Sequence, residues 1–509
     1  MRGDHHGGEA SSTWSLDPVL DPVDLELAAG IFQSLAEEMG VSLVRSARSA
    51  NIKERRDSST AIFDHRGRLV AQAEHIPVHL GALPASVRVV AGREQSPGDV
   101  WILNHPYMGG THLPDVTMVA PVFVGGKLDA YVATRAHHAE IGGMHGGSMS
   151  AGTRELYQEG LIVPPVRIRR EGVECRGILA LILANCRRPE ERQGDLRAQT
   201  AAVALGADRL AAIGERRGEG YLGTAMREVR AYSIRRVCAS LACLPAGTYH
   251  GEDSLEGDGI STVPVPIRVD IDVRKDSLVF DLSASAEEVE GNLNCPRAVT
   301  ESACLFVARS LLDPSPMGAA GCAELVEVRT RSGSVVDARM PRAVAGGNVE
   351  TSQRIVDAAL DGLGEVLDLP AASQGTMNNL VIAGTGFSYY ETVAGGGGAS
   401  RHGDGADGVH SAMTNTLNTP VEAVEKEFPV KVLRYEFREG SGGAGMNRGG
   451  EGLIREFQVL QPCLMSLLAE RQVEGAPVGS KVVRALSAGD VITLKTPGGG
   501  GWGSSSGAG

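Results

Sequence analysis

The residues of this chain that could bind a metal ion are concentrated between Asn104 and His145. This stretch contains a His112-x-x-Asp115 pair and, further along, the adjacent pair His137-His138. Two imidazoles and one carboxylate form a ligand set that suits zinc or manganese, and three protein ligands leave a coordination position open for chemistry. We therefore expect an open metal site if the two pairs meet in space.

A β-hairpin is the element that would bring the two pairs together. Two β-prone runs, 116–124 and 128–134, are separated by Gly125-Gly126-Lys127, which is a hairpin signal. A two-residue turn at the glycines predicts the facing pairs Asp115–Ala136 and Pro114–His137. Both sets of potential ligands then lie at the same end of the hairpin, and Pro114 favours an extended loop there rather than a helix.

The register leaves the choice between the two adjacent histidines open. Side chains alternate along a strand, so only one of His137 and His138 is expected to be a first ligand. Glu140 and His145 are reserve ligands, or partners that orient the ligands. The alternative for all of these side chains is that they are loop residues that satisfy backbone groups.

Two further candidates lie upstream of this stretch. Asp57 belongs to a densely charged segment, where an ion pair with a neighbouring arginine is the simpler interpretation. His79 follows His75 by four residues, but Pro77 between them argues against a helical zinc-binding pair. On pattern alone, His79 is a turn histidine.

Glycine-rich stretches could cradle phosphate, but none carries the signature of a phosphate loop. The runs at 395–398, 440–450 and 497–501 contain no G-x-x-x-x-G-K-[ST] motif, and none clearly separates a strand from a helix. Tight turns are the better interpretation. We expect no nucleotide site in this chain.

Hydrophobic periodicity predicts a mixed α+β fold with largely antiparallel sheets, flanking helices and glycine-rich loops. Helical spacing follows the Asp21-Pro22 cap to residue 48 and recurs at 84–95, 199–216, 224–244, 299–312 and 350–367. Strand patterns are found at 58–63, 68–72, 100–104, 267–274, 277–282, 430–437, 453–460 and 464–469. We expect a disordered extension at 1–17, a metal-site domain at 18–250 and a C-terminal α+β domain at 251–509.

Composition excludes several classes of protein. Among the 509 residues, 42% are hydrophobic and 22% charged, which is ordinary for a globular protein. The net charge of −13 argues against a nucleic-acid binder, which needs a basic surface. The eight cysteines form no C-x-x-C pair, a pattern that suits reduced thiols. No apolar run approaches the roughly 20 residues that span a bilayer, and the polar N-terminus is not a secretory signal. We expect a cytoplasmic protein that binds neither nucleic acid nor a membrane.

Several stretches together resemble the hydantoinase B/5-oxoprolinase family. They include NIKERRD (51–57), PGDVWILNHPYMGGTHLPDV (97–116), TRAHHAEIGG (134–143), YYETVAGGGGAS (389–400) and GSGGAGMNRGGEG (440–452). The resemblance extends from about residue 18 to the C-terminal glycines. It implies that His112, Asp115 and His137 are the metal ligands, which resolves the choice that the register left open. It also implies that Asp57 is an acidic residue near the metal.

What the resemblance implies about activity is an ATP-dependent hydrolase of a cyclic amide such as a hydantoin, 5-oxoproline or a lactam. A hydantoinase A-type partner subunit would bind ATP and activate the ring carbonyl, and this chain would hold a divalent ion, Zn or Mn, within a hetero-oligomer. Water activated by the metal would attack the activated carbon. Asp57 or Glu140 could act as general base, and His138 or His79 could stabilise developing charge.

Two other functions are possible alternatives to a cyclic amide hydrolase. One is the metal-bearing subunit of an ATP-dependent ketone carboxylase, and the other is a non-catalytic scaffold for the A-type subunit. The chain also departs from the family pattern: His105 replaces a usual Asp, Glu140 stands where Asp is commoner, and 315–322 lacks the usual asparagine. These departures leave the metal trio intact and point to an atypical substrate preference.

Overall fold

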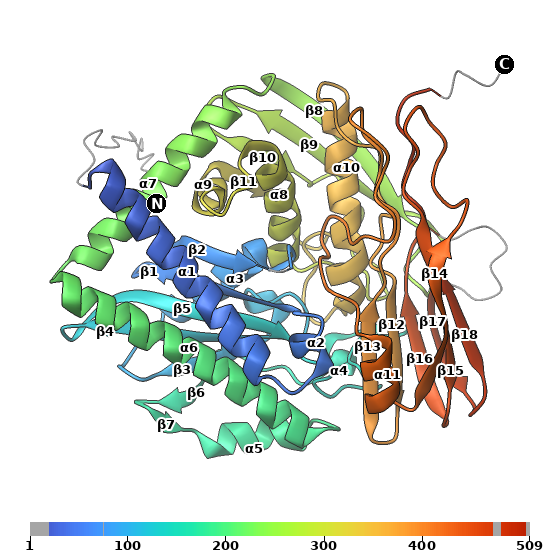
Figure 1. Ribbon diagram of the computed structural model, residues 1–509, viewed down its shortest axis with the longest axis horizontal. Helices are drawn as coiled ribbons and strands as arrows, with labels where there is room; N and C mark the ends of the chain where they lie inside the picture. Colours follow the sequence, from blue (N-terminus) through green and yellow to red (C-terminus); the bar gives the residue numbers. More distant parts are fainter. Residues whose placement is uncertain (1–19, 75, 472–479, 505–509) are drawn as a thin grey trace, which may run out of the picture.

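The computed structural model describes residues 20–74, 76–471 and 480–504, and it has the expected α+β architecture (Figure 1). Its main helices are α1 (Pro22–Ser46), α3 (His79–Ala91), α5 (Arg176–Ala184), α6 (Pro189–Arg217), α7 (Tyr221–Leu241), α8 (Arg297–Leu312), α9 (Gly318–Leu325) and α10 (Ser352–Gly364). Short helices are α2 (Ala50–Lys53), α4 (Leu156–Glu159) and α11 (Val421–Glu427). The extension predicted at 1–17 lies outside the described residues.

The sheets are largely antiparallel, as the sequence predicts. The first sheet contains, in spatial order, β2 (Leu69–Glu74), β1 (Ser58–Asp64), β5 (Lys127–His137), β4 (Asp115–Val124), β3 (Val100–Leu103), β6 (Val166–Arg170) and β7 (Val173–Glu174). A second sheet contains β11 (Val326–Arg329), β10 (Leu278–Asp281), β9 (Val265–Val273) and β8 (Gly247–Leu255), and its β10–β11 pair is parallel.

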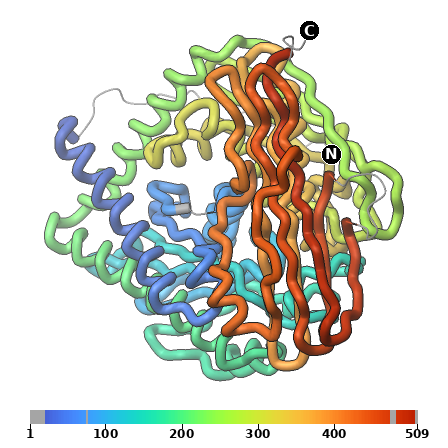
Figure 2. The backbone as a smooth tube through the Cα atoms, turned by 45° about the vertical axis from the view of Figure 1, so that its right-hand side comes forward, coloured from blue at the N-terminus to red at the C-terminus, as the bar shows by residue number. Residues whose placement is uncertain are grey.

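The C-terminal third contributes two further sheets that lie side by side along one flank of the molecule (Figure 2). One contains β13 (Phe387–Thr392), β12 (Asn379–Gly384), β16 (Cys463–Leu468) and β17 (Lys481–Leu486). The other contains β14 (Val430–Arg438), β15 (Gly452–Val459) and β18 (Val491–Lys495). Apolar residues from the two sheets, including Tyr389 and Phe457, share one core.

Helices cover both faces of the first sheet. α1 and α6 pack on one face, where Met118 and Val132 meet Phe32 and Val203 in one hydrophobic cluster (Figure 1). α3 packs on the opposite face. Because side chains alternate along β4 and β5, each residue of these strands is assigned to one helix layer or the other. This assignment decides which polar side chains can meet.

The start of α3 differs from the prediction. The sequence pattern places a helix at 84–95, but the helix begins at His79 and has Pro84 in its interior. Its first turn is stabilised from outside, because the backbone N–H groups of Gly81 and Ala82 both donate to Ser302 Oγ on α8, at 3.0 and 3.1 Å. A side chain from a distant helix therefore satisfies donors that a local cap would otherwise have to satisfy.

The register of the β4–β5 hairpin also differs from the prediction, at the end of the hairpin that carries the potential metal ligands. Near the turn, Phe123 faces Leu128 as predicted, but Asp129 is an extra residue that shifts the register beyond it. Asp115 consequently faces His137, not Ala136. A β-bulge of this kind moves every later side chain of the strand to the other face. The hairpin is confirmed, and its predicted facing pairs at 114–115 and 136–137 are wrong.

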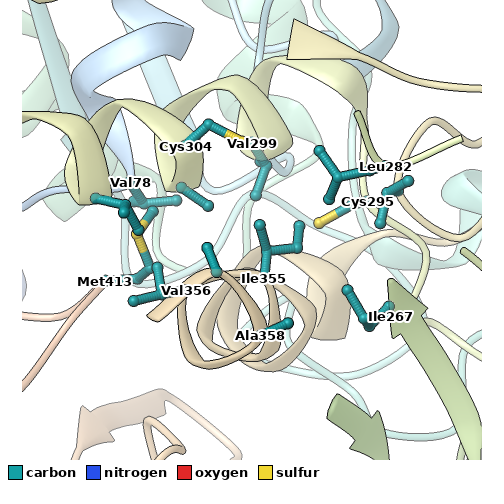
Figure 3. Packing of buried hydrophobic residues seen from close by; sticks show 14 of the residues in the cluster. Val78, Ile267, Leu282, Cys295, Val299, Cys304, Ile355, Val356, Ala358 and Met413 are labelled. Carbon is teal, nitrogen blue, oxygen red and sulfur yellow. The ribbon is translucent and has the colours of Figure 1, made fainter. Parts of the chain in front are cut away.

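The largest hydrophobic cluster joins segments from far apart in the chain. Figure 3 shows α8 and α10 packing through Val299, Ile355 and Val356, with Val78 and Met413 beside them. This cluster includes residues on both sides of position 250, so the division at 18–250 and 251–509 stays a prediction. Within the described residues, no helix is both long enough and apolar enough to span a membrane.

Candidate metal centre

Three elements bring potential metal ligands to one end of the first sheet. Asp115 is the first residue of β4, and His137 is the last residue of β5, directly opposite it. His112 lies on the turn before β4, and its carbonyl oxygen accepts a hydrogen bond from the Asp115 N–H at 3.1 Å. The alternation of side chains points Asp115 and His137 to the face that α3 covers.

The side chains of this trio converge on one another. His112 Nδ1 lies 3.1 Å from Asp115 Oδ2, and His137 Nδ1 lies 3.3 Å from Asp115 Oδ1. One ligand atom from each residue can be chosen so that all three lie within 4.8 Å of one another. All three side chains are buried. The trio selected from the sequence is therefore brought together by the fold.

Charge and burial favour the ionisation states that metal binding needs. Burial alone would raise the pKa of the Asp115 carboxyl, but the charges of His112 and His79 and the close approach of the His112 and His137 imidazoles hold this pKa well below its ordinary value. Burial lowers the pKa of His137 below its ordinary value. An ionised carboxylate beside a neutral imidazole is the form in which both side chains coordinate a cation.

The hydrogen bonding of the trio is incomplete. Within the described residues, Asp115 Oδ1 and His137 Nε2 are buried and make no hydrogen bond. Buried polar atoms without partners are costly, and each one calls for a ligand, an ion or a bound water. The donor set and these orphaned atoms together fit a divalent ion held by His112, Asp115 and His137.

Two of the other predicted residues lie beside the trio. His79, at the start of α3, has Nε2 3.4 Å from Asp115 Oδ2 and Nδ1 2.9 Å from Ser59 Oγ. Asp57 accepts the backbone N–H of His137 at its carbonyl oxygen, at 3.0 Å, and its carboxylate lies 3.8 Å from Arg55 Nη2. The simpler ion-pair interpretation of Asp57 thus holds, and the residue also adjoins the trio.

His138 lies on the opposite face of the sheet, against α6. Its Nε2 lies 2.8 Å from Gln199 Oε1. Burial, and secondarily the positive charge of Arg192, lowers the pKa of His138 to about 3. A neutral imidazole that is hydrogen bonded to a helix on the other side of the sheet does not face the trio.

The remaining candidates anchor the loop that follows β5. Glu140 accepts hydrogen bonds from the backbone N–H groups of Gly142 at 3.0 Å and Arg187 at 2.7 Å. His145 Nδ1 lies 2.9 Å from Ser150 Oγ. The Glu140 contacts hold the loop beside the segment that precedes α6, the His145 contact lies within the loop, and neither includes the trio.

Three residues at the site were not selected from the sequence. Thr111 Oγ1 donates to Asp115 Oδ2 at 2.5 Å. The Tyr390 ring on β13 stacks on the His137 imidazole, with 4.6 Å between centroids and 12° between planes. Asn348 Nδ2 lies 3.5 Å from His112 Nε2. Thr111 adjoins His112 in sequence, but no spacing rule links positions 348 and 390 to the hairpin.

Comparison with known proteins finds relatives that match almost the whole chain. Residues 21–481 match the hydantoinase B/oxoprolinase family. The chain is 36% identical to 5-oxoprolinase 1 of Arabidopsis thaliana over 97% of its own length and 43% of that protein. It is 29% identical to one subunit of a putative D-/L-hydantoinase of a Pseudomonas species, over 89% and 80% of the two chains. It therefore spans less than half of the plant oxoprolinase.

A solved structure shares the fold over nearly the whole chain. The ATP-dependent caprolactamase from Pseudomonas jessenii superimposes with a TM-score of 0.86 at 25% identity, over 96% of this chain and 92% of that one. The match of sequence and fold thus extends well beyond the hairpin that carries the trio. The chain belongs to the hydantoinase B/oxoprolinase family.

Proposed function

We propose that this chain is the metal-bearing component of an ATP-dependent hydrolase of cyclic amides. The observation that carries the proposal is the convergence of His112, Asp115 and His137 at one end of a hairpin in a member of this family. The names of the similar proteins, a caprolactamase and a 5-oxoprolinase, support a cyclic amide as the class of substrate.

The chemistry of the substrate explains why ATP and a metal would both be used. An amide carbonyl is a poor electrophile, and phosphorylation of its oxygen would supply a leaving group. A divalent ion at the trio would polarise an oxygen of the substrate and lower the pKa of a bound water. The buried position of Asp115 strengthens its interaction with any cation, since few water dipoles screen it.

The neighbouring residues have roles that follow from their contacts. His79, held by Ser59, directs Nε2 toward Asp115 and orients this carboxylate. Asp57 adjoins His137 and is the additional carboxylate that we propose as a further ligand or general base. We assign His138 and Glu140 to holding the end of β5 and its following loop, because their hydrogen bonds go to α6 and to backbone groups.

We further propose that ATP binds to a separate component in a cytoplasmic hetero-oligomer. The Pseudomonas relative is named as one subunit of a hydantoinase, which supports a companion chain. The plant oxoprolinase, of which this chain spans 43%, supports the same division of labour within one longer chain. The chain contains no G-x-x-x-x-G-K-[ST] motif, which agrees with activation elsewhere.

The proposal is tested by reconstitution. The chain is produced together with a candidate A-type subunit, its metal content is measured, and 5-oxoproline, hydantoin and caprolactam are each supplied with ATP. We expect a stoichiometric divalent ion and a ring-opened product from at least one substrate. His112→Ala should abolish product formation while ATP hydrolysis by the partner continues. Unchanged product formation by this variant contradicts the proposal, and product from acetone and bicarbonate instead would favour a carboxylase.

A further inference from the structure

A π-helical turn, η2 (Gly347–Thr351), lies against the candidate metal centre and leads into α10. π turns hold an extra residue and are frequent at functional sites. The turn packs closely on the preceding backbone, because a Cβ at Gly347 would lie 2.0 Å from Asn294 O. Asn348 on this turn lies beside His112, with 3.5 Å between Nδ2 and Nε2, and half a turn of its amide would present Oδ1, which makes no hydrogen bond within the described residues, as the acceptor for an N–H of a metal-bound imidazole.

Glu350, on the same turn, begins a chain of buried hydrogen bonds. Its Oε1 accepts from Asn379 Nδ2 and from the backbone N–H of Met377, both at 3.3 Å. Asn379 Oδ1 in turn accepts the hydroxyl of Tyr390 at 2.8 Å. Glu350, Asn379 and Tyr390 are all buried, so each of these bonds is made away from bulk water.

Tyr390 connects this series of hydrogen bonds to the trio. Its ring is nearly parallel to the His137 imidazole, 12° between planes, at a centroid distance of 4.6 Å. The Arg55 guanidinium lies 4.8 Å from the same ring, and its Nη1 donates to the Tyr390 carbonyl oxygen at 3.1 Å. Stacking, hydroxyl and backbone contacts therefore fix the plane against which His137 rests.

We propose that the π-helical turn positions both imidazoles of the metal centre, through Asn348 for His112 and through Glu350, Asn379 and Tyr390 for His137. None of these four side chains is assigned as a ligand. They act by orienting the ligands, in the way that partners of metal-bound histidines raise affinity elsewhere. The inference rests on the proposed function, since it presupposes a metal at the trio.

The protonation of Glu350 indicates which substitution should preserve its hydrogen bonds. Burial, and secondarily the negative charge of Glu470, raises the pKa of Glu350 to about 8. Arg354 and Lys481 are both paired with Glu470. Burial thus favours the protonated carboxyl near neutral pH, and glutamine reproduces its shape and its acceptor oxygen.

Cobalt binding to the full-length chain tests the proposal in two arms. The first compares the wild-type protein with His112→Ala, and stoichiometric Co²⁺ binding should be lost in the variant. The second measures Co²⁺ affinity by chelator competition, together with the visible spectrum of the bound ion. Glu350→Ala should weaken binding by roughly 10- to 100-fold and change the spectrum, because an orienting partner is lost. Glu350→Gln should retain the wild-type affinity and spectrum.

Two more variants guard against misfolding. Ser388→Ala is the matched control, since Ser388 is buried on β13 two positions before Tyr390 and its hydroxyl makes no hydrogen bond within the described ranges. It should bind Co²⁺ as the wild type does. Tyr390→Phe keeps the stacked ring but removes the hydroxyl through which Glu350 and Asn379 act on it, so it should weaken binding about as much as Glu350→Ala. Circular dichroism measures whether each variant is folded.

The measurements separate a failure of the proposed function from a failure of the positioning role. If the wild-type chain binds no stoichiometric Co²⁺, the proposed function fails and the positioning role falls with it. If the first arm succeeds but Glu350→Ala has the wild-type affinity and spectrum, only the positioning role is overturned. A Glu350→Gln variant as impaired as Glu350→Ala, or a Tyr390→Phe variant that matches the wild type, also overturns it. Should Glu350→Ala fail to fold, these last two variants decide the question.

Discussion

Glu391 and Asp115 are both buried carboxylates on strands of this molecule, but their hydrogen-bond partners differ. Glu391 on β13 accepts hydrogen bonds from the Arg455 guanidinium and the Tyr389 hydroxyl, and from Thr419 N at 2.6 Å and Asn418 Nδ2 at 3.2 Å. Asp115 on β4 is approached by three imidazoles and the Thr111 hydroxyl, and its Oδ1 makes no hydrogen bond within the described residues.

The partners explain the difference. A guanidinium is permanently charged, so Arg455 and Glu391 neutralise each other in a closed pair. An imidazole can lose its proton and then offers a lone pair, so His112 and His137 can share Asp115 with a cation instead of neutralising it. A closed pair holds the fold, and an open carboxylate–imidazole group is available for a metal. Substitutions in and around the two groups test this contrast.

The largest effect is expected from Asp115→Asn. The amide is nearly isosteric but a poor ligand, so product formation and metal binding should fall by more than the roughly 100-fold that loss of an orienting partner causes. Thermal stability should fall less than in a variant that breaks a closed pair, because the buried Arg135 guanidinium, which senses the charge of Asp115, makes its hydrogen bonds to Thr117, Ser86 and two backbone carbonyl groups. Metal analysis, turnover with the partner and a melting curve provide the measurements. A strongly destabilised variant would show that Asp115 belongs to a closed pair after all.

Glu391→Gln should have the reverse effect. It leaves the buried Arg455 guanidinium without a negative partner, which costs about 3–5 kcal/mol of the free energy of unfolding. Metal affinity of the folded protein should be unchanged. Urea unfolding measures the loss. The control is Asp368→Asn, which breaks the exposed 2.7 Å pair with Arg401 and should cost at most about 1 kcal/mol. Equal losses in the two variants would contradict the contrast.

His138→Gln should alter the pH dependence of stability and leave metal binding intact. The folded-state pKa of His138 is about 3, against an ordinary value of 6.5, so between these values the unfolded chain binds the extra proton. His138 therefore makes the free energy of unfolding increase with pH, by up to about 1.4 kcal/mol per pH unit. The increase is complete above pH 6.5, and this contribution is lost as the pH falls toward 3.

The comparison with wild type is made by urea unfolding at several values of pH. His138→Gln should show a shallower rise than wild type over this window. An identical slope in the two proteins would mean that His138 is not held neutral against α6. Loss of stoichiometric metal in this variant would place His138 at the metal centre and contradict the assignment of the two histidines to opposite faces.

Thr111→Val is expected to have the smallest effect. It keeps the shape of the side chain but removes the hydroxyl that donates to Asp115 Oδ2. Loss of this orienting bond should weaken metal affinity by about 10-fold, with turnover at saturating metal close to wild type. Chelator competition measures the affinity. If turnover at saturating metal collapses instead, Thr111 has a role beyond orienting the carboxylate.

Local patterns in the sequence were sufficient for much of the fold. α1 begins after Asp21, whose carboxylate accepts hydrogen bonds from Val23 N and Asp24 N at 2.9 Å, as its cap signature predicts. The β4–β5 hairpin was predictable because two glycines with positive φ connect two β-prone runs. These features depend on neighbours in the chain, which is why periodicity, caps and turns reveal them.

The start of α3 and the buried environment of the site were not predictable in this way. Ser302 completes the first turn of α3 from more than 200 positions away. Tyr390 and Asn348 reach the histidines from the C-terminal half of the chain. Contacts between such distant positions leave no spacing signal in a single sequence.

The sequence by itself determined which residue types meet at the end of the hairpin: His112-x-x-Asp115 on one side and His137-His138 on the other. Residue patterns left the choice between the two histidines open, and the family resemblance pointed to His137. In the structure the bulge at Asp129 places His137 opposite Asp115 and turns His138 toward α6. A strand alternates with a period of two, so a single extra residue, set by pairing within the sheet, decides which imidazole faces the carboxylate.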